Sequence, residues 1–179
     1  LETVILVESG KSFTVAVGDK SFDVKAGDKS DNIPAELEKA LTKDVNGNLT
    51  FGVPENYVAI IGTTPYESFA EALNAVAAGE TIKLVKDSRP LTKMLTIAGK
   101  TFTLDLNGHQ IKASLTALEL SNGTNMTVQD SSASASGILY SDYTGIIVDA
   151  GTTLTVKSGT IKGDTNAVSN SGTVNIEGT

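Results

Sequence analysis

A short apolar-polar-apolar triplet recurs in the second half of the chain and constrains its fold more than any other feature. The four copies begin at Leu104, Met126, Leu154 and Val174, with spacings of 22, 28 and 20 residues. The longest spacing contains a Ser/Ala run from residue 131 to 136, which indicates a loop insertion. A period near 22 residues, built from short alternating strands, is typical of a solenoid whose rungs stack along one axis. Period-two strands in register predict two inward ladders, Leu104-Met126-Leu154-Val174 and Leu106-Val128-Val156-Ile176.

The segment before these repeats contains the clearest helical pattern in the chain. Apolar residues recur at helical spacing from residue 66 to 78, at Phe69, Leu73 and Val76. Ser68 and Glu71 are suited to cap the start of this helix, and Gly79 is suited to end it. We expect the helix to cover the first rung, beside Ile97 and Phe102.

The first 56 residues have a different pattern. Residues 3–28 alternate as in strands, with turns at Gly10-Lys11, Gly18-Asp19 and Gly27-Asp28. A short helix is predicted over residues 33–41 after the candidate caps Asp31 and Asn32, followed by a hairpin over residues 43–51. We therefore expect a small β-rich attachment or capping domain over 1–56, a strand-helix-strand cap over 57–93, and stacked rungs over 94–179.

Composition excludes several classes of protein. The chain has no Cys, so disulfides and thiolate metal sites are absent, and its few aromatic residues suit stacked aliphatic ladders. Its net charge is −7, and no basic stripe is evident that would bind nucleic acid. No apolar run approaches the length of about 20 residues that a transmembrane helix needs, so no membrane insertion is predicted.

Two segments resemble a known family. Residues 57–87 (YVAIIGTTPYESFAEALNAVAAGETIKLVKD) are similar to the opening unit of right-handed parallel β-helix regions in bacterial surface proteins, which have the pectate-lyase-like fold. Residues 95–111 (LTIAGKTFTLDLNGHQI) resemble the first rung of the same families, and looser repeats continue to residue 179. The resemblance implies a mostly β protein, a right-handed parallel β-helix capped by a short α-helix. It leaves residues 1–56 uncovered.

Pectate-lyase-like enzymes share this fold, so the resemblance raises catalysis as a function. The resemblance implies that such lyases use clustered carboxylates and a basic residue, commonly Arg, but Arg89 is the single arginine and precedes the repeats. Asp105 and Asp130 lie on neighbouring rungs, and we expect them to be solvent-facing acids on polar strand faces. The single histidine, His109, follows the Asn107-Gly108 turn and has no partner at a readable spacing, so it is expected to be a corner residue. No enzymatic activity and no cofactor are predicted.

Weaker site hypotheses concern metal and ligand binding. Asp44, Asn46, Asn48 and Glu55 follow the ligand spacing of a calcium loop, although Leu49 stands where the sharp turn needs Gly; a plain Asn-Gly hairpin explains the same residues. Tyr140 and Tyr143, placed in an insertion after Ile138, are candidates for carbohydrate stacking or for local packing. The Thr-X-Thr pairs at 101–103 and 153–155 invite an ice-binding interpretation, but the pattern is missing from the other predicted rungs. Recurrent asparagines are expected to bond to the backbone of the next rung.

The sequence therefore predicts a non-enzymatic structural or attachment protein displayed outside a cell, an adhesin-type β-helix of a bacterial surface protein. The first alternative is a bacteriophage virion protein, such as a head or tail fibre or a capsid decoration. The second is a polysaccharide lyase or hydrolase. A surface glycan or protein receptor is the expected partner, and a homo-oligomer or larger assembly is expected because the last rung would otherwise leave strand edges bare.

Overall fold

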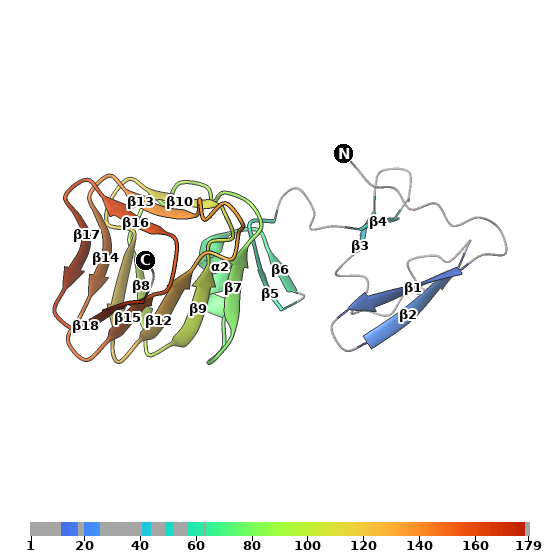
Figure 1. The fold of residues 1–179 in the computed structure, drawn as a ribbon, viewed down its shortest axis with the longest axis horizontal. Coiled ribbons are helices and arrows are strands. Elements are labelled where there is room, and N and C mark those ends of the chain that lie inside the picture. Colours follow the sequence, from blue (N-terminus) through green and yellow to red (C-terminus); the bar gives the residue numbers. More distant parts are fainter. Residues whose placement is uncertain are drawn as a thin grey trace. The chain divides into compact units, whose positions relative to one another are not determined.

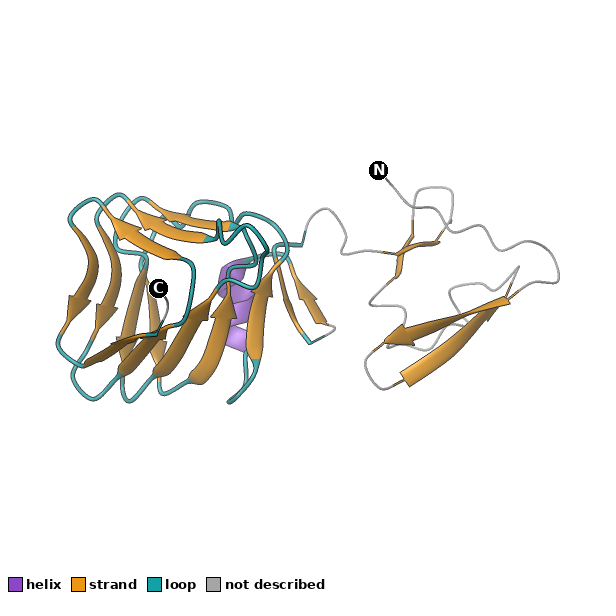
Figure 2. Cartoon of the chain, in the orientation of Figure 1, coloured by secondary structure: helices purple, strands orange, loops and turns teal. Residues whose placement is uncertain are grey.

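The computed structural model describes residues 12–17, 20–25, 41–43, 49–51, 57–62 and 64–177. The chain divides into two compact units, residues 1–56 with 62–65 and residues 57–61 with 66–179. The described residues are mostly β. Figures 1 and 2 show these strands together with the one helix in the described part of the chain.

The first unit contains two antiparallel pairs. Strand β1 (Ser12–Val17) pairs with β2 (Lys20–Lys25), and β3 (Leu41–Lys43) pairs with β4 (Leu49–Phe51). The strands predicted on either side of Gly18-Asp19 and Asn46-Gly47 are confirmed. Leu41, predicted as the end of a helix, instead begins β3. The calcium candidates Asp44, Asn46, Asn48 and Glu55 lie outside the described residues.

The second unit is built from three sheets. The seven-stranded sheet has the order β18-β15-β12-β9-β7-β5-β6, the three-stranded sheet β10-β13-β16 and the four-stranded sheet β17-β14-β11-β8. The strands before the repeats are β5 (Ala59–Ile61), β6 (Thr64–Tyr66), β7 (Thr81–Leu84) and β8 (Leu95–Ala98). Those within the repeats are β9 (Thr101–Asp105), β10 (Gln110–Ala113), β11 (Leu118–Ser121), β12 (Asn125–Gln129), β13 (Ile138–Ser141), β14 (Thr144–Val148), β15 (Thr153–Val156), β16 (Thr160–Gly163), β17 (Asn166–Asn170) and β18 (Thr173–Ile176).

The chain visits the three sheets in the same order on each pass. We call β9-β10-β11 the first rung, β12-β13-β14 the second and β15-β16-β17 the third; each contributes one strand to each sheet. All pairs between rungs are parallel, whereas β5 and β7 are antiparallel. The Ser/Ala run predicted as an insertion lies between β12 and β13, outside any strand. The stacked strands are visible in Figure 1 from β7 to β18.

The register between the first two rungs differs from the one predicted. Met126 pairs with Phe102, 24 residues earlier, and Val128 pairs with Leu104. The inward ladders are therefore Phe102-Met126-Leu154-Val174 and Leu104-Val128-Val156-Ile176, so the predicted places of Leu104 and Leu106 were wrong. A shift of two residues keeps every side chain on the same face, so the hydrophobic pattern alone cannot detect it.

These ladders form the core between the sheets. Phe102, Met126, Leu154, Leu104 and Val128 are all buried. Burial declines toward the last described rung: Val156 and Val174 are only partly buried, and Ile176 is 66% exposed. The predicted inward direction is confirmed for Met126, Val128 and Leu154, whereas Ile176, predicted to point inward, is exposed.

One helix packs against the first strands of this core. Helix α2 (Phe69–Ala75) has Ser68 as its N-cap, and the Ser68 hydroxyl and the Glu71 carboxylate form the predicted capping box. The helix is shorter than the 66–78 prediction because β6 takes up Tyr66 and the chain leaves helical geometry at Val76. Its apolar side belongs to the same core cluster as Ile97 and Phe102.

The side chain of Lys100 forms hydrogen bonds with the C-terminal end of this helix. Its ammonium donates to the carbonyl oxygens of Leu73 and Asn74, both at 2.8 Å, and of Val76 at 3.3 Å. These carbonyls belong to the last turn, where a helix lacks internal donors and where a positive charge is favourable. A side chain from the turn between β8 and β9 therefore completes the helix end.

Candidate functional site

The outward face of the three-stranded sheet carries a ladder of Lys112, Tyr140 and Lys162. Register pairs Tyr140 with Lys112 on one side and with Lys162 on the other. The two ammonium groups lie 5.7 and 5.2 Å from the centre of the tyrosine ring, within cation–π range. Tyr140 is thus part of strand β13 rather than of an insertion. A sugar stacking on its ring would have to displace these lysines.

The hydroxyl of Tyr140 is also engaged. It donates to Asp164 Oδ2 at 2.9 Å. This hydrogen bond, then partial desolvation and the neighbouring Asp142 carboxylate, raise the pKa of Tyr140 to about 12. The phenol therefore stays protonated at physiological pH and serves as a donor to Asp164.

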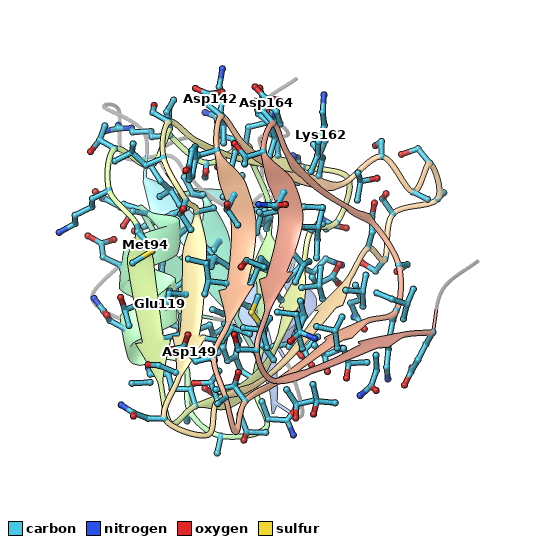
Figure 3. All side chains as sticks on the ribbon, turned by 90° about the vertical axis from the view of Figure 1, so that its left-hand side faces the viewer. Met94, Glu119, Asp142, Asp149, Lys162 and Asp164 are labelled. Carbon is cyan, nitrogen blue, oxygen red and sulfur yellow. The ribbon has the colours of Figure 1, made fainter. Side chains whose placement is uncertain are left out.

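The adjacent corner, between the three-stranded and four-stranded sheets, is exposed and partly apolar. Residues of β10 and β11 pair with residues 28 positions later, on β13 and β14 respectively. Leu115 and Tyr143, which are also 28 residues apart, are therefore equivalent positions on the first and second rungs. Their exposed fractions are 55% and 57%. Asp142 and Asp164 are likewise equivalent on the second and third rungs, because Ser141 pairs with Gly163. Figure 3 shows Asp142, Asp164 and Lys162 gathered at one edge of the unit and directed outward. We call Leu115, Tyr143, Asp142 and Asp164 the corner ridge.

Asp105 and Asp130 do not form a solvent-facing pair. Both are buried, with exposed fractions of 4% and 8%. Asp105 accepts backbone N–H groups from Asn107 and Ser131 at 3.0 and 2.9 Å, so it joins a turn of the first rung to the insertion. The expectation that these acids are exposed was wrong, because the insertion after β12 folds over them.

Asp130 accepts more backbone hydrogen bonds than Asp105 does. Its carboxylate accepts backbone N–H groups from Gly108 at 2.8 Å, Ser132 at 3.0 Å and Gly137 at 2.5 Å. Burial raises the pKa of Asp130, but the hydrogen bonds from Ser132, Gly137 and Gly108 together outweigh it, so its pKa lies below the usual value. A carboxylate saturated by backbone amides is a structural anchor and a poor general base or nucleophile.

Gly137 shows how closely the insertion is packed here. A Cβ atom at this position would lie 2.5 Å from the Leu106 Cβ and 2.7 Å from Asp130 Oδ2. Only glycine therefore lets the backbone approach the Asp130 carboxylate at this point.

His109 has a partner that the sequence analysis did not find. Its Nδ1 lies 3.4 Å from Asp87 Oδ1, and the same carboxylate oxygen accepts the backbone N–H of Gln110 at 2.8 Å. Asp87 precedes His109 by 22 residues, one rung period, and that spacing is the signal that would have identified the pair. The predicted corner position is confirmed. Asp87 is 66% exposed, so solvent weakens the interaction.

Asn107, at the same corner as His109, bonds to the backbone of a neighbouring rung, as predicted for the recurrent asparagines. Asn107 has a φ of 46° and its side-chain amide donates to the Leu84 carbonyl at 2.9 Å, one rung earlier. Asn122 also adopts a positive φ, of 50°, before Gly123 at the next corner. These residues hold the rung geometry.

Metal binding has no support within residues 57–62 and 64–177, where no group of three or more His, Cys, Asp or Glu side chains is placed to hold an ion. A shallow depression beside the start of α2 is lined by Phe69, Arg89, Pro90, Leu91 and Lys93, among others. Its lining also includes the Glu67 carboxylate beside the basic side chains of Arg89 and Lys93.

No protein-family model, curated protein or solved structure matches this chain. Among the described residues, no helix is both long and apolar enough to cross a membrane.

Proposed function

We propose that residues 81–177 form a right-handed parallel β-helix and that it acts as a non-enzymatic attachment module displayed outside a bacterial cell. The proposal of a β-helix is supported by the three sheets that recur in constant order and parallel register. Right-handed crossovers are the rule for parallel strands, in about 98% of cases, which supports the proposed hand. Stacked rungs give a stiff body with long lateral faces.

The observation that carries the attachment role is the corner ridge. An exposed aromatic ring at Tyr143 lies next in sequence to Asp142, and Asp164 is the equivalent carboxylate on the following rung. Rings of this kind stack on the apolar faces of sugars, and carboxylates accept hydrogen bonds from vicinal hydroxyls. The ridge is open to solvent on a rigid scaffold, so a glycan chain can lie along it without a pocket. We infer that a surface glycan is the ligand.

The environment of Asp105 and Asp130 argues against their use in catalysis. Hydrolysis of a glycosidic bond needs two carboxyl groups that flank it, one of them protonated at working pH. Asp105 and Asp130 are committed to backbone amides, and the pKa of Asp130 is lowered rather than raised. Asp105 and Asp130 are therefore not available as the two carboxyl groups of a hydrolase.

Binding to an array of immobilised bacterial and host glycans tests this role. Tyr143→Ala is expected to weaken binding by roughly fivefold, since loss of stacking on a ring costs on the order of 1 kcal/mol. Tyr143→Phe keeps the ring and is expected to bind as well as the parent chain. Retention of full binding by Tyr143→Ala, or release of reducing ends from a bound glycan, would contradict the proposal.

A further inference from the structure

The outward face of the seven-stranded sheet carries two ladders of threonine and asparagine. Register aligns five positions in one ladder, Thr81, Thr103, Thr127, Thr155 and Asn175. The second ladder runs beside it and contains Thr101, Asn125, Thr153 and Thr173. We call these nine residues the threonine face. In the sequence, the Thr-X-Thr pairs at 101–103 and 153–155 look isolated. On the other two strands, β12 and β18, asparagine replaces one threonine of the pair: the segments are Asn125-Met126-Thr127 and Thr173-Val174-Asn175.

The geometry of this face is regular in two directions. Neighbouring strands lie about 4.8 Å apart, and alternate residues along a strand about 6.6 Å apart, so the side chains form a regular grid that follows the twist of the sheet from β7 to β18 (Figure 1). Threonine has few χ1 rotamers, and neighbours in a ladder restrict it further, so the hydroxyls and methyls are held in place before binding. All nine side chains are exposed or half-buried.

The chemistry of the face restricts its ligands. It carries no charge, although the chain as a whole has a net charge of −7. A metal ion would need carboxylates, nucleic acid would need lysines and arginines, and a sugar would favour an aromatic ring; the nine residues include none of these. Each threonine offers one donor, two acceptors and a methyl group. The next row is polar or charged: Lys83 and Gln129 lie on β7 and β12, and Lys157 and Glu177 directly follow β15 and β18. These side chains bound the grid on one side.

From this grid we infer that the threonine face binds ice. Hexagonal ice presents rows of oxygen atoms whose repeats in two perpendicular directions are close to the two spacings of the grid. A regular array of hydroxyls can join these rows while the methyl groups occupy the spaces between them. The inference goes beyond glycan attachment at the corner ridge and does not depend on it, because the two surfaces lie on different sheets.

The test is adsorption of the full chain to a growing single crystal of ice. Two quantities are measured: the fluorescence of labelled protein on the ice surface and the shape of the crystal. The chain has no Cys, so one cysteine added at its N-terminus takes a single fluorophore. The parent protein is expected to coat the ice and to give the crystal facets. Thr127→Lys, at the centre of the face, places a flexible charge on the grid and is expected to abolish both effects; Thr155→Lys is a second variant in case the first does not fold.

Thr96→Lys is the matched control. Thr96 lies on β8 in the four-stranded sheet, is exposed, and bonds to Glu119, with which a lysine can pair. This variant is expected to bind ice like the parent. Absence of the parent protein from the ice, or equal binding by the folded Thr127→Lys or Thr155→Lys and Thr96→Lys proteins, would overturn the inference. So would sedimentation showing that the parent self-associates through this face and that Thr127→Lys is monomeric, with no ice bound by either.

Discussion

Val128→Asp is expected to prevent the second unit from folding. Val128 is fully buried and lies between Leu104 and Val156 in an inward ladder. A carboxylate there has no water and no partner, so the substitution should lower the free energy of unfolding by about 4 kcal/mol or more. Loss of the cooperative thermal transition, followed by far-ultraviolet circular dichroism, is the measurement.

Thr127→Asp gives this experiment its control. Thr127 is the preceding residue on the same strand and lies on the opposite, outward face. The same carboxylate there stays in contact with water, so we expect a change of no more than about 1 kcal/mol. Equal damage from the two substitutions would mean that β12 does not have one buried and one solvated face.

Asp130→Asn should be the most disruptive substitution among the acids of the rungs. An amide keeps one acceptor oxygen but removes the charge and turns a nitrogen toward the backbone donors of Gly108, Ser132 and Gly137. We expect the free energy of unfolding at pH 7 to fall by about 2 to 4 kcal/mol, measured by urea titration. Asp149→Asn, at the end of β14 on another face, should be close to neutral.

The effect of Asp130 should also depend on pH in a definite direction. Its folded-state pKa is lowered, so its ionised form adds stability above the unfolded-state pKa of about 3.9. That stability is lost as the pH falls through the lower, folded-state pKa. The parent protein should therefore lose stability more steeply than Asp130→Asn in this acidic range, and the two curves should converge. Parallel curves would show that the carboxylate is not the anchor inferred from its hydrogen bonds.

The sequence predicts the stacking of strands well, because each strand has its own alternation of apolar and polar residues. It does not predict the register between rungs, since shifting Met126 from Leu104 to Phe102 leaves both partners apolar and inward. The length of α2 was overestimated for a related reason. Tyr66 fits a helical pattern, but its backbone accepts a strand hydrogen bond from Val58.

Contacts between rungs explain what was missed in the candidate sites. The pairing of His109 with Asp87 and the burial of Asp130 depend on which residues become neighbours after the chain has completed a turn. The same holds for the threonine face, whose continuity appears only when the 24-residue offset between the first two rungs is known. Local sequence patterns identify such residues as polar residues at corners or on strands. The register between rungs determines which residues they contact.

The register of stacked rungs underlies the proposed fold, the corner ridge and the threonine face, and methyl NMR tests it most directly. The chain has two methionines, so selective labelling of the ε-methyl groups gives a spectrum in which Met126 is readily assigned. We predict nuclear Overhauser effects from Met126 to the ring of Phe102 and to the methyls of Leu154, its partners on the two adjacent strands. A Met126 methyl at its random-coil shift, without contacts to residues 24 before and 28 after it, would contradict the account.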